Sequence, residues 1–436
     1  MRRFESCWKG WVLMVPAPKL NALWEEKPLG EILSEVSVRA SDLSREEADA
    51  ARVLSLTKNF GLIPQTDRFL KRIATTDVSR YKVVRKGWLV YNPYVLWEGA
   101  IDALEQEEIG LVSPVYHVWQ PKRTCSEFLS YLLKTPEMLN AYLKVAHGTV
   151  KRRRAVRTSS FKKLSVMLPP LEEQTTIARV LDATRRAEEA RQHELTLERE
   201  RKAALMQHLF THGIRSESAK MTEIGEIPRS WGVAKLGAIA KIGNGSTPKR
   251  SDERYWRNGT IPWITSTKIH DLTITQADQF VTDTARNECH LPLVSRGSVV
   301  VAITGQGKTL GNAAILAIDT CINQHLAYIR FQDASVQPQF ALFYLQSKYR
   351  YLREIGAAGG STKGALTCGF LKRMSIPVPP PDQQSTIAGL LLACETRYKR
   401  LEKEVALLSE FFRAIVEELM TGRLSSIPLI EEYQPQ

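Results

Sequence analysis

The chain has 436 residues, 25% of them charged and 43% hydrophobic, which is the composition of a folded globular protein and excludes a largely disordered one. Lys and Arg outnumber Asp and Glu by 60 to 47, so the formal net charge is +13. Such an excess favours a polyanionic partner, although a basic surface kept for solubility gives the same balance.

Six cysteines are scattered along the sequence, at Cys7, Cys125, Cys289, Cys321, Cys368 and Cys394. They form no C-x-x-C pair and no cluster with histidines, which argues against a metal site and against a secreted disulfide framework. No apolar run approaches the roughly 18 residues that span a bilayer. We therefore expect a cytoplasmic protein with no metal and no membrane contact.

The first half opens with a segment rich in β-branched and aromatic residues and broken by Gly, Pro and Asn. The elements predicted there are helices at 44–54 and 125–134 and strands at 87–91 and 111–119. A Pro169-Pro170 pair follows, and it fixes an extended backbone because proline is excluded from helix interiors. Acidic residues come next and favour a helix start, so we predict a long helix over 172–210.

The second half has the same order of elements. The elements predicted in it are strands at 261–265, 297–303 and 325–331, a helix at 338–347, and a long helix at 382–420. The long helix has a seam of apolar residues at alternating spacings of four and three: Ile387, Leu391, Cys394, Tyr398, Leu401, Val405, Leu408, Phe412, Ile415 and Leu419. This pattern predicts one stripe buried against a partner helix. The first long helix has polar residues at corresponding places: Thr184, Glu188, Arg191, Glu198 and Lys202.

The sequence is an internal repeat. Residues 165–183 and 375–393 share nine identical residues, each pair separated by 210 positions. The same spacing relates 86–90 to 296–300, and Trp24 matches Trp231 at a spacing of 207. Three matches in nearly constant register predict two related units that fill the chain.

The fold class expected is mixed α+β: two strand-rich globular domains joined and spaced by two long α-helices, in a pseudo-two-fold internal repeat. The boundaries expected are 1–164, 165–215, 222–374 and 375–425. The simplest partner of each long helix is the other one, in an antiparallel coiled coil. The alternative is that each helix packs on its own domain or on another subunit.

The residues that carry the repeat resemble the specificity subunits of type I restriction-modification systems. The matching stretches are PPLEEQTTIA at 169–178, PPPDQQSTIA at 379–388, IPRSWGVAKLG at 227–237, GNGSTP at 243–248 and CINQHLAYI at 321–329. The resemblance covers the chain from about Trp24 onward, whereas the first twenty or so residues fit the pattern poorly.

The resemblance implies two target-recognition domains, 1–164 and 222–374, which each read one half of a bipartite double-stranded DNA target. It implies that the helical regions 165–215 and 375–425 space these domains and dock two methyltransferase subunits, to which helicase-nuclease restriction subunits attach. It also implies a subunit without a catalytic site, whose partners use S-adenosylmethionine, ATP and magnesium. The alternative is an orphan DNA-binding adaptor or coiled-coil scaffold with no enzyme partner.

Candidate DNA contacts are the polar and basic residues of loops and strand ends, because Arg can grip guanine, Asn or Gln adenine, and Ser, Thr and Lys mostly phosphate. In the first half they are Lys82, Arg85, Tyr91, Asn92, Ser113 and the basic run Lys151, Arg152, Arg153 and Arg154. In the second half they are Asn244, Ser246, Thr247, Lys249, Arg250, Ser266, Thr267, Lys268, Gln306, Lys308, Gln324, His325, Ser361, Thr362 and Lys363. The alternative for the basic run is a solvated surface.

Two motifs resemble catalytic ones without matching them. The stretch 302–309, AITGQGKT, resembles a phosphate-binding loop, but Ala302 stands where that motif has its first glycine. Asn92-Pro93-Tyr94 resembles an adenine-methyltransferase tetrapeptide but has a single proline. We interpret the first as a polar loop facing DNA and the second as a turn at a strand end.

Overall fold

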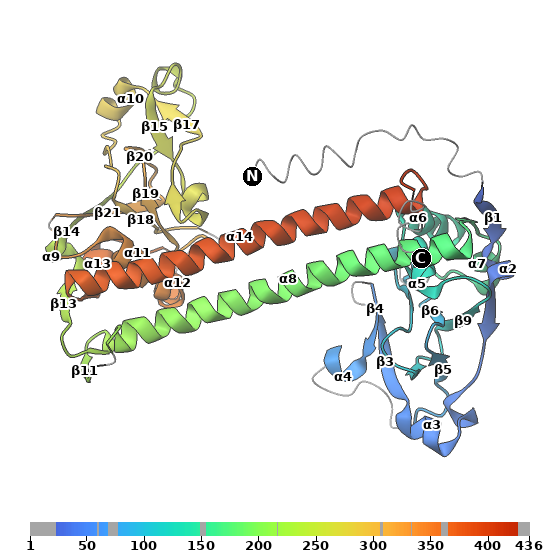
Figure 1. Ribbon diagram of the computed structural model, residues 1–436. Coiled ribbons are helices and arrows are strands. Elements are labelled where there is room, and N and C mark those ends of the chain that lie inside the picture. The colour runs from blue at the N-terminus through green and yellow to red at the C-terminus, as the bar shows by residue number, and fades with distance from the viewer. Residues whose placement is uncertain are drawn as a thin grey trace, which may run out of the picture. The chain divides into compact units, whose positions relative to one another are not determined.

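The structure is a computed structural model in which the chain forms two compact units (Figure 1). Unit 1 comprises residues 1–191 and 404–436, and unit 2 comprises residues 192–403. The residues that the structure describes are 23–58, 61–68, 77–148, 154–215, 217–305, 308–332, 334–358 and 365–425.

Unit 1 contains two four-stranded sheets, with the strand orders β2-β9-β6-β7 and β4-β3-β8-β5, and a separate antiparallel ladder of β1 with β10. Its strands are β1 (Glu25–Pro28), β2 (Leu33–Val36), β3 (Arg52–Thr57), β4 (Gly61–Pro64), β5 (Lys82–Arg85), β6 (Leu89–Tyr91), β7 (Ile101–Ala103), β8 (Ile109–Val112), β9 (His117–Pro121) and β10 (Ser165–Leu168). Its short helices are α2 (Leu29–Ile32), η2 (Ala40–Asp42), α3 (Arg45–Ala50), α4 (Gln65–Arg68), η3 (Leu96–Glu98), α5 (Ser126–Leu132), α6 (Pro136–Val145) and α7 (Thr158–Lys162).

Unit 2 contains a five-stranded sheet of order β14-β21-β18-β19-β16, a three-stranded sheet of order β17-β15-β20, and the ladders β11-β12 and β13-β22. Its strands are β11 (Ala219–Thr222), β12 (Gly225–Pro228), β13 (Gly232–Lys235), β14 (Ala240–Asn244), β15 (Ile261–Ile264), β16 (Thr273–Ile274), β17 (Gln279–Val281), β18 (Val299–Ala302), β19 (Ala313–Leu316), β20 (Cys321–Ile322), β21 (Leu326–Phe331) and β22 (Ser375–Val378). Its short helices are α9 (Leu236–Ile239), η5 (Glu253–Tyr255), η6 (Ser266–His270), α10 (Asp283–Glu288), α11 (Pro338–Ser347), α12 (Tyr349–Ala358) and α13 (Cys368–Arg373).

Two long helices, α8 (Leu171–His212) and α14 (Pro381–Met420), each contribute to both units. Within each unit they run antiparallel (Figure 1), as the sequence predicts. In unit 1, Leu419 of α14 and Ile177 of α8 belong to one buried cluster, and in unit 2, Leu209 of α8 and Leu391 of α14 do so. All ten predicted seam positions of α14 are buried or half-buried.

The polar seam of α8 is matched by polar groups of α14. In unit 2, Lys202 pairs with Glu395, and the carboxylate of Glu198, which is 4% exposed, lies 3.3 Å from the guanidinium of Arg397. In unit 1, Glu188 accepts a hydrogen bond from Ser409. The contact between α8 and α14 therefore has two parts, a stripe of buried apolar side chains and a stripe of specific polar pairs. Both parts fix the register of one helix against the other.

The duplication is visible in the backbone hydrogen bonds of the two units. The Leu29 N–H donates to the Leu164 carbonyl at 2.8 Å, and the Leu236 N–H donates to the Met374 carbonyl at 2.9 Å. The ladder β1-β10 has the register of the ladder β13-β22, at the spacings of 207 and 210 found in the sequence. The predicted repeat is confirmed as a repeat of structure.

The proline-glutamine segments that lead into the long helices are equivalent as well. The Gln174 amide donates to the Pro169 carbonyl at 2.8 Å, and the Gln384 amide donates to the Pro379 carbonyl at the same distance. Both glutamines are buried, at 3% and 0% exposure. We call these two glutamine contacts, with the Leu29 and Leu236 hydrogen bonds and the two ladders, the shared frame.

Two sequence predictions of local structure were wrong in part. The helix expected at 44–54 ends at Ala50, and residues 52–57 form β3, which pairs with β8 at 52–53 and with β4 at 54–57, where Leu54 and Leu56 are buried. The single strand expected at 111–119 is two strands, β8 and β9, because a turn containing Pro114 separates them. The other predicted strands and helices are present with ends shifted by a few residues.

Candidate nucleic-acid interface

In unit 2, several candidate residues meet beside the turn between β20 and β21. The Thr247 hydroxyl donates to the Gln324 amide oxygen at 2.5 Å, and the Gln324 amide nitrogen lies 3.3 Å from Nε2 of His325. Nδ1 of His325 lies 2.5 Å from the hydroxyl of Thr304, which follows β18. The two segments that carry Thr247 and Thr304 thus hold this glutamine and this histidine in place.

Arg250 is also held in a defined orientation. Its guanidinium carbon lies 4.1 Å from the ring centroid of Trp256 and 4.8 Å from that of Trp263, and it donates to the Gln279 amide oxygen at 2.6 Å. Trp263 is 1% exposed and Trp256 packs against it edge to face, so these rings belong to the core of unit 2. An exposed guanidinium stacked on a rigid aromatic pair is pre-oriented for an anionic or guanine partner.

The remaining candidates of unit 2 lie on other elements. Ser266, Thr267 and Lys268 belong to η6, and the Lys268 ammonium lies 2.7 Å from the Asp278 carboxylate, which neutralises part of its charge. Lys308 lies in an exposed turn after β18. Asn244, Ser246 and Lys249 lie in or after the end of β14, and the Ser246 hydroxyl donates to the Cys289 carbonyl at 3.1 Å.

The candidates of unit 1 are more strongly engaged within the protein. The Lys82 ammonium donates to the Tyr116 carbonyl at 2.6 Å, and burial lowers the pKa of Lys82. Arg85 is paired with Glu47 at 2.6 Å. Tyr91 has no exposed surface, so it has no face to offer DNA, and the interpretation of Tyr91 as a contact is corrected to a core residue.

The remaining candidates of unit 1 are Asn92, Ser113 and the basic run at 151–154. The Asn92 side-chain oxygen accepts from the Tyr94 N–H at 3.1 Å, which is the turn expected of the Asn-Pro pair. Ser113 is half-buried, and Arg154 donates to the Gly148 carbonyl at 3.2 Å. The candidates that lie outside the described residues are Lys151, Arg152, Arg153, Gln306, Ser361, Thr362 and Lys363.

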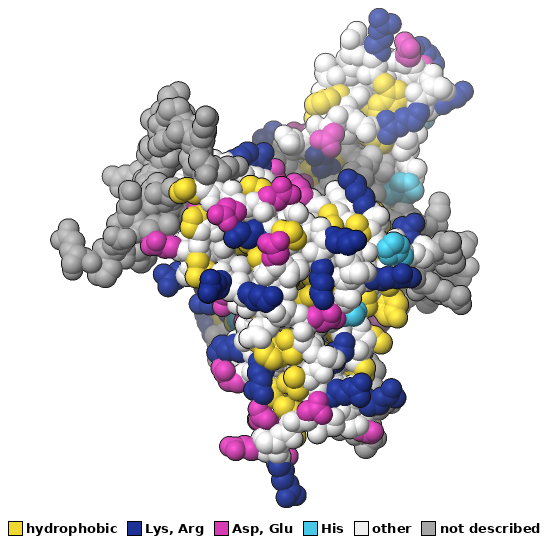
Figure 2. Space-filling model, turned by 90° about the vertical axis from the view of Figure 1, so that its right-hand side faces the viewer, with side chains coloured by type: hydrophobic (Ala, Val, Ile, Leu, Met, Phe, Trp, Pro, Cys, Tyr) yellow, Lys and Arg dark blue, Asp and Glu magenta, His cyan; other side chains and the backbone are white. Residues whose placement is uncertain are grey.

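Charge by itself marks no single patch on the face of unit 1 that Figure 2 shows. Figure 2 shows Lys and Arg side chains spread over the face that is turned to the viewer, with Asp and Glu among them. Sequence reasoning overlooked Thr304 and Gly245, which position other residues and carry no charge that would single them out.

The loop that resembles a phosphate-binding motif does not continue into a helix. After Lys308 the chain forms turns as far as Asn312, and β19 begins at Ala313. A phosphate-binding loop needs the N-terminus of a helix behind it, so the geometry favours the interpretation as a polar loop.

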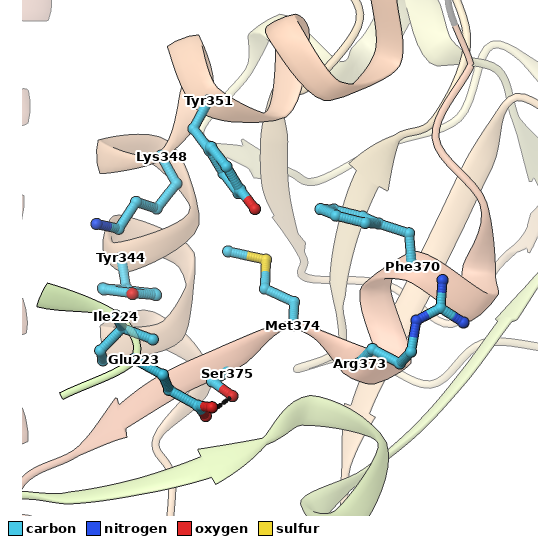
Figure 3. Close-up of a pocket in the computed structure, with 9 residues that line it drawn as sticks. All are labelled: Glu223, Ile224, Tyr344, Lys348, Tyr351, Phe370, Arg373, Met374 and Ser375. Carbon is cyan, nitrogen blue, oxygen red and sulfur yellow. Dashed lines mark hydrogen bonds between the residues drawn. The ribbon is translucent and has the colours of Figure 1, made fainter. Parts of the chain in front are cut away.

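A pocket of about 500 Å³ lies elsewhere in unit 2, between α11, α12, α13 and the β11-β12 turn (Figure 3). Tyr344, Tyr351 and Phe370 supply aromatic walls, while Lys348 lies on the rim, where burial lowers its pKa. The Glu223 carboxylate accepts a hydrogen bond from Ser375 (Figure 3). The nine residues that line this pocket include no histidine or cysteine, and none of the candidate DNA contacts.

The described part of the chain holds neither grouped metal ligands nor a helix suited to a bilayer. No three His, Cys, Asp or Glu side chains among the described residues are grouped to hold a metal ion. Within the same ranges, no helix combines the length and apolar character needed to cross a membrane.

Comparison with known proteins gives concordant results. The sequence model of the family described as "Type I restriction modification DNA specificity domain" matches residues 104–197 and 228–405, more than half of the chain. The chain is 30% identical over 195 residues to the type I restriction enzyme MjaIX specificity subunit of Methanocaldococcus jannaschii, and this match covers 44% of each protein. It is 27% identical over 303 residues to the putative MjaX specificity subunit of the same organism, with 68% of each protein covered.

The chain thus spans less than half of the length of the first of these relatives. Its fold is similar to the crystal structure of a type I restriction-modification S subunit from M. genitalium, with a TM-score of 0.58 at 14% sequence identity. That similarity covers 93% of this chain and 97% of the other.

Proposed function

Because the chain belongs to the family of type I restriction-modification DNA specificity subunits, we propose that it is the subunit that selects the DNA target of such a complex. The observation that carries this proposal is the shared frame, which builds two related globular units from one chain. Two related units suit a target made of two separate half-sites.

Each globular segment, 1–164 and 222–374, reads one half of the target in this proposal. Unit 2 supports it with the pre-oriented groups Arg250, Gln324 and His325, which match the side-chain types that read base edges or hold phosphate. The net charge of +13 supplies the sequence-independent attraction to the duplex.

The chain itself is non-catalytic in this proposal, and it acts in the cytoplasm. Methyltransferase subunits, two in number, dock on the helical regions 165–215 and 375–425, and restriction subunits join them. Those partners use S-adenosylmethionine, ATP and magnesium. The exposed faces of α8 and α14, which include Leu390, Leu392 and Leu407 among polar residues, are the surfaces left for such docking once the helices have paired.

The test is to map DNA methylation genome-wide in cells with and without this gene. We expect one bipartite sequence to lose methylation when the gene is deleted, and to regain it when the gene is restored. An unchanged methylation map would contradict the proposal and support the orphan adaptor or scaffold instead. Binding of the purified full-length chain to that duplex, against a duplex with both half-sites scrambled, separates DNA recognition from assembly.

A further inference from the structure

Both units contain the same turn between two equivalent strands. In unit 1 the Tyr116 N–H donates to the Ser113 carbonyl at 3.0 Å, and in unit 2 the Leu326 N–H donates to the Asn323 carbonyl at 3.3 Å. The strands after these turns pair equivalently, since β9 aligns with β6 as β21 aligns with β18 at a constant offset of 210. The backbone of this turn is therefore part of what was duplicated.

The side chains on the two turns have different chemistry. Unit 1 has Pro114 and Val115, both exposed, and Val115 is 49% exposed. Unit 2 has Gln324, which is exposed, and His325, which is half-buried. One backbone thus presents apolar groups in one unit and hydrogen-bonding groups in the other.

The Gln324 amide is fixed before any ligand arrives. Its oxygen accepts from the Thr247 hydroxyl at 2.5 Å, and its nitrogen lies 3.3 Å from Nε2 of His325. With that nitrogen donating to Nε2, the imidazole carries its proton on Nδ1, which lies 2.5 Å from the Thr304 hydroxyl. One lone pair of the amide oxygen and one N–H of the amide nitrogen stay available on the exposed side chain.

The loop that carries Thr247 is itself held against the turn. A Cβ built on Gly245 would overlap the Ile322 carbonyl, so glycine is needed for this close approach. The Ser246 carbonyl accepts from Nε1 of Trp263 at 3.2 Å, which anchors the next residue to the core. Val38 stands at the position of Gly245 in unit 1, and there the Lys82 ammonium holds the turn through the Tyr116 carbonyl.

We infer that Gln324 reads an adenine of the half-site bound by unit 2, an inference that rests on the function proposed above. A glutamine amide offers one acceptor and one donor side by side, which complement N6 and N7 of adenine in the major groove. The brace of Thr247 and His325 leaves those two groups free and fixes their plane, so little side-chain freedom is lost on binding. Pro114 and Val115 offer no side-chain hydrogen bond, so the matching turn of unit 1 reads its half-site by other means.

The test uses the full-length chain, expressed with its partner subunits, and compares methylated sequences for the wild type, Gln324→Ala and Thr247→Val. Gln324→Ala should make one adenine position of the unit 2 half-site degenerate, lowering the preference there by about 5- to 150-fold, with the other positions unchanged. Thr247→Val keeps the amide and removes a brace, so the preference at the same position should weaken less. Gln276→Ala, at an exposed glutamine of unit 2 between β16 and β17, is the matched control and should leave the recognised sequence unchanged.

The outcomes separate this inference from the proposed function. If the wild type directs methylation of a bipartite sequence and Gln324→Ala directs methylation of the same sequence, the inference that Gln324 reads adenine is overturned. The proposed function stands in that case. A change confined to the other half-site, or a unit 2 half-site without any A·T pair, also overturns the inference. A wild type that directs no methylation overturns the proposed function. If Gln324→Ala fails to fold, as judged by circular dichroism, Thr247→Val decides the question alone.

Discussion

In unit 1 the turn after β8 exposes a proline and a valine, whereas in unit 2 the matching turn after β20 carries an exposed glutamine and a half-buried histidine. The strands on both sides of the two turns nevertheless pair in equivalent register. The difference teaches that a duplicated domain can change the side chains on a turn without changing the backbone pairing of the strand that follows it.

The largest expected effect tests whether each unit determines one half of the recognised sequence independently of the other. Replacing residues 222–374 with the corresponding segment of another family member should change one half of the recognised sequence and leave the other half as it is. The reason is that the hydrogen bonds of the unit 1 frame involve no residue of that segment. Methylation mapping measures this, and a change in both halves would show that the units do not read DNA independently.

The next-largest effect tests whether the shared frame contributes equally to the free energy of unfolding in the two units. Gln384 donates to the carbonyls of Pro379 and Ser335 at 2.8 and 2.7 Å, and it accepts from the Gln337 N–H at 2.7 Å. Gln384→Ala leaves buried groups unpaired and should lower the free energy of unfolding by about 3 kcal/mol.

Gln174→Ala should cost a similar amount, because the Gln174 amide oxygen likewise accepts from the Cys125 N–H at 3.0 Å. Chemical denaturation of both variants provides the comparison. Gln207→Ala, an exposed glutamine on α8, is the control and should change stability by less than about 0.5 kcal/mol. A large loss for only one frame glutamine would mean that the two frames are alike in geometry and not in energy.

A smaller effect compares the α8–α14 contact in the two units. The Glu198 side chain is 4% exposed and pairs with Arg201 and Arg397, whose side chains are 55% and 47% exposed. Glu198→Ala should cost about 1–2 kcal/mol, since the half-exposed arginines can return to water.

In unit 1, Glu404 lies 3.8 Å from Arg191, and its side chain is 39% exposed, against 4% for Glu198. Glu404→Ala should therefore cost at most about 0.5 kcal/mol. Thermal unfolding followed by circular dichroism checks both variants. Equal losses would show that burial of the carboxylate does not decide the strength of these pairs.

The smallest effect concerns pH. Burial lowers the pKa of His117 in unit 1 below its usual 6.5, against the opposing hydrogen bond to Glu35, and Ala327 stands at the matching position in unit 2. Because the unfolded chain binds the proton more tightly, the stability contributed by His117 is present above pH 6.5 and is lost as the pH falls through the folded value.

His117→Gln should flatten the fall in stability of unit 1 below that pH. The midpoint of urea denaturation, followed for unit 1 at a series of pH values, measures it. The same pH dependence in the variant would assign the loss to other groups.

Sequence reasoning predicted what depends on periodicity and repetition. The seam of α14 and the proline-glutamine segments placed both long helices within two residues of their ends, and the 210-residue spacing predicted the duplication. It failed at 44–54, where a helix does begin at Arg45 but residues 52–57 form β3, which pairs with β8 through Arg52 and Val53. That pairing joins residues more than fifty positions apart, which no local pattern reveals.

The candidate site was predicted only by residue type. Residue type makes Lys82 and Gln324 equal candidates, yet the ammonium of one is engaged by a backbone carbonyl and the side chain of the other is held open to solvent. Tyr91 was wrongly predicted to contact DNA, because the sequence does not show on which face of a sheet a tyrosine at a strand end lies. Exposure and bracing come from tertiary packing, and they decide which polar residues can meet DNA.

The core of unit 1 has a consequence for how the chain folds during synthesis. Leu419 and Met420, at the end of α14, pack in the same buried cluster as Trp24 and Leu29. The ribosome therefore makes the first residues of this core, then all of unit 2, and only afterwards the helix that closes the core. Unit 2 can fold as it emerges, while unit 1 must wait with an apolar surface uncovered, so a premature stop within α14 would damage the domain encoded first.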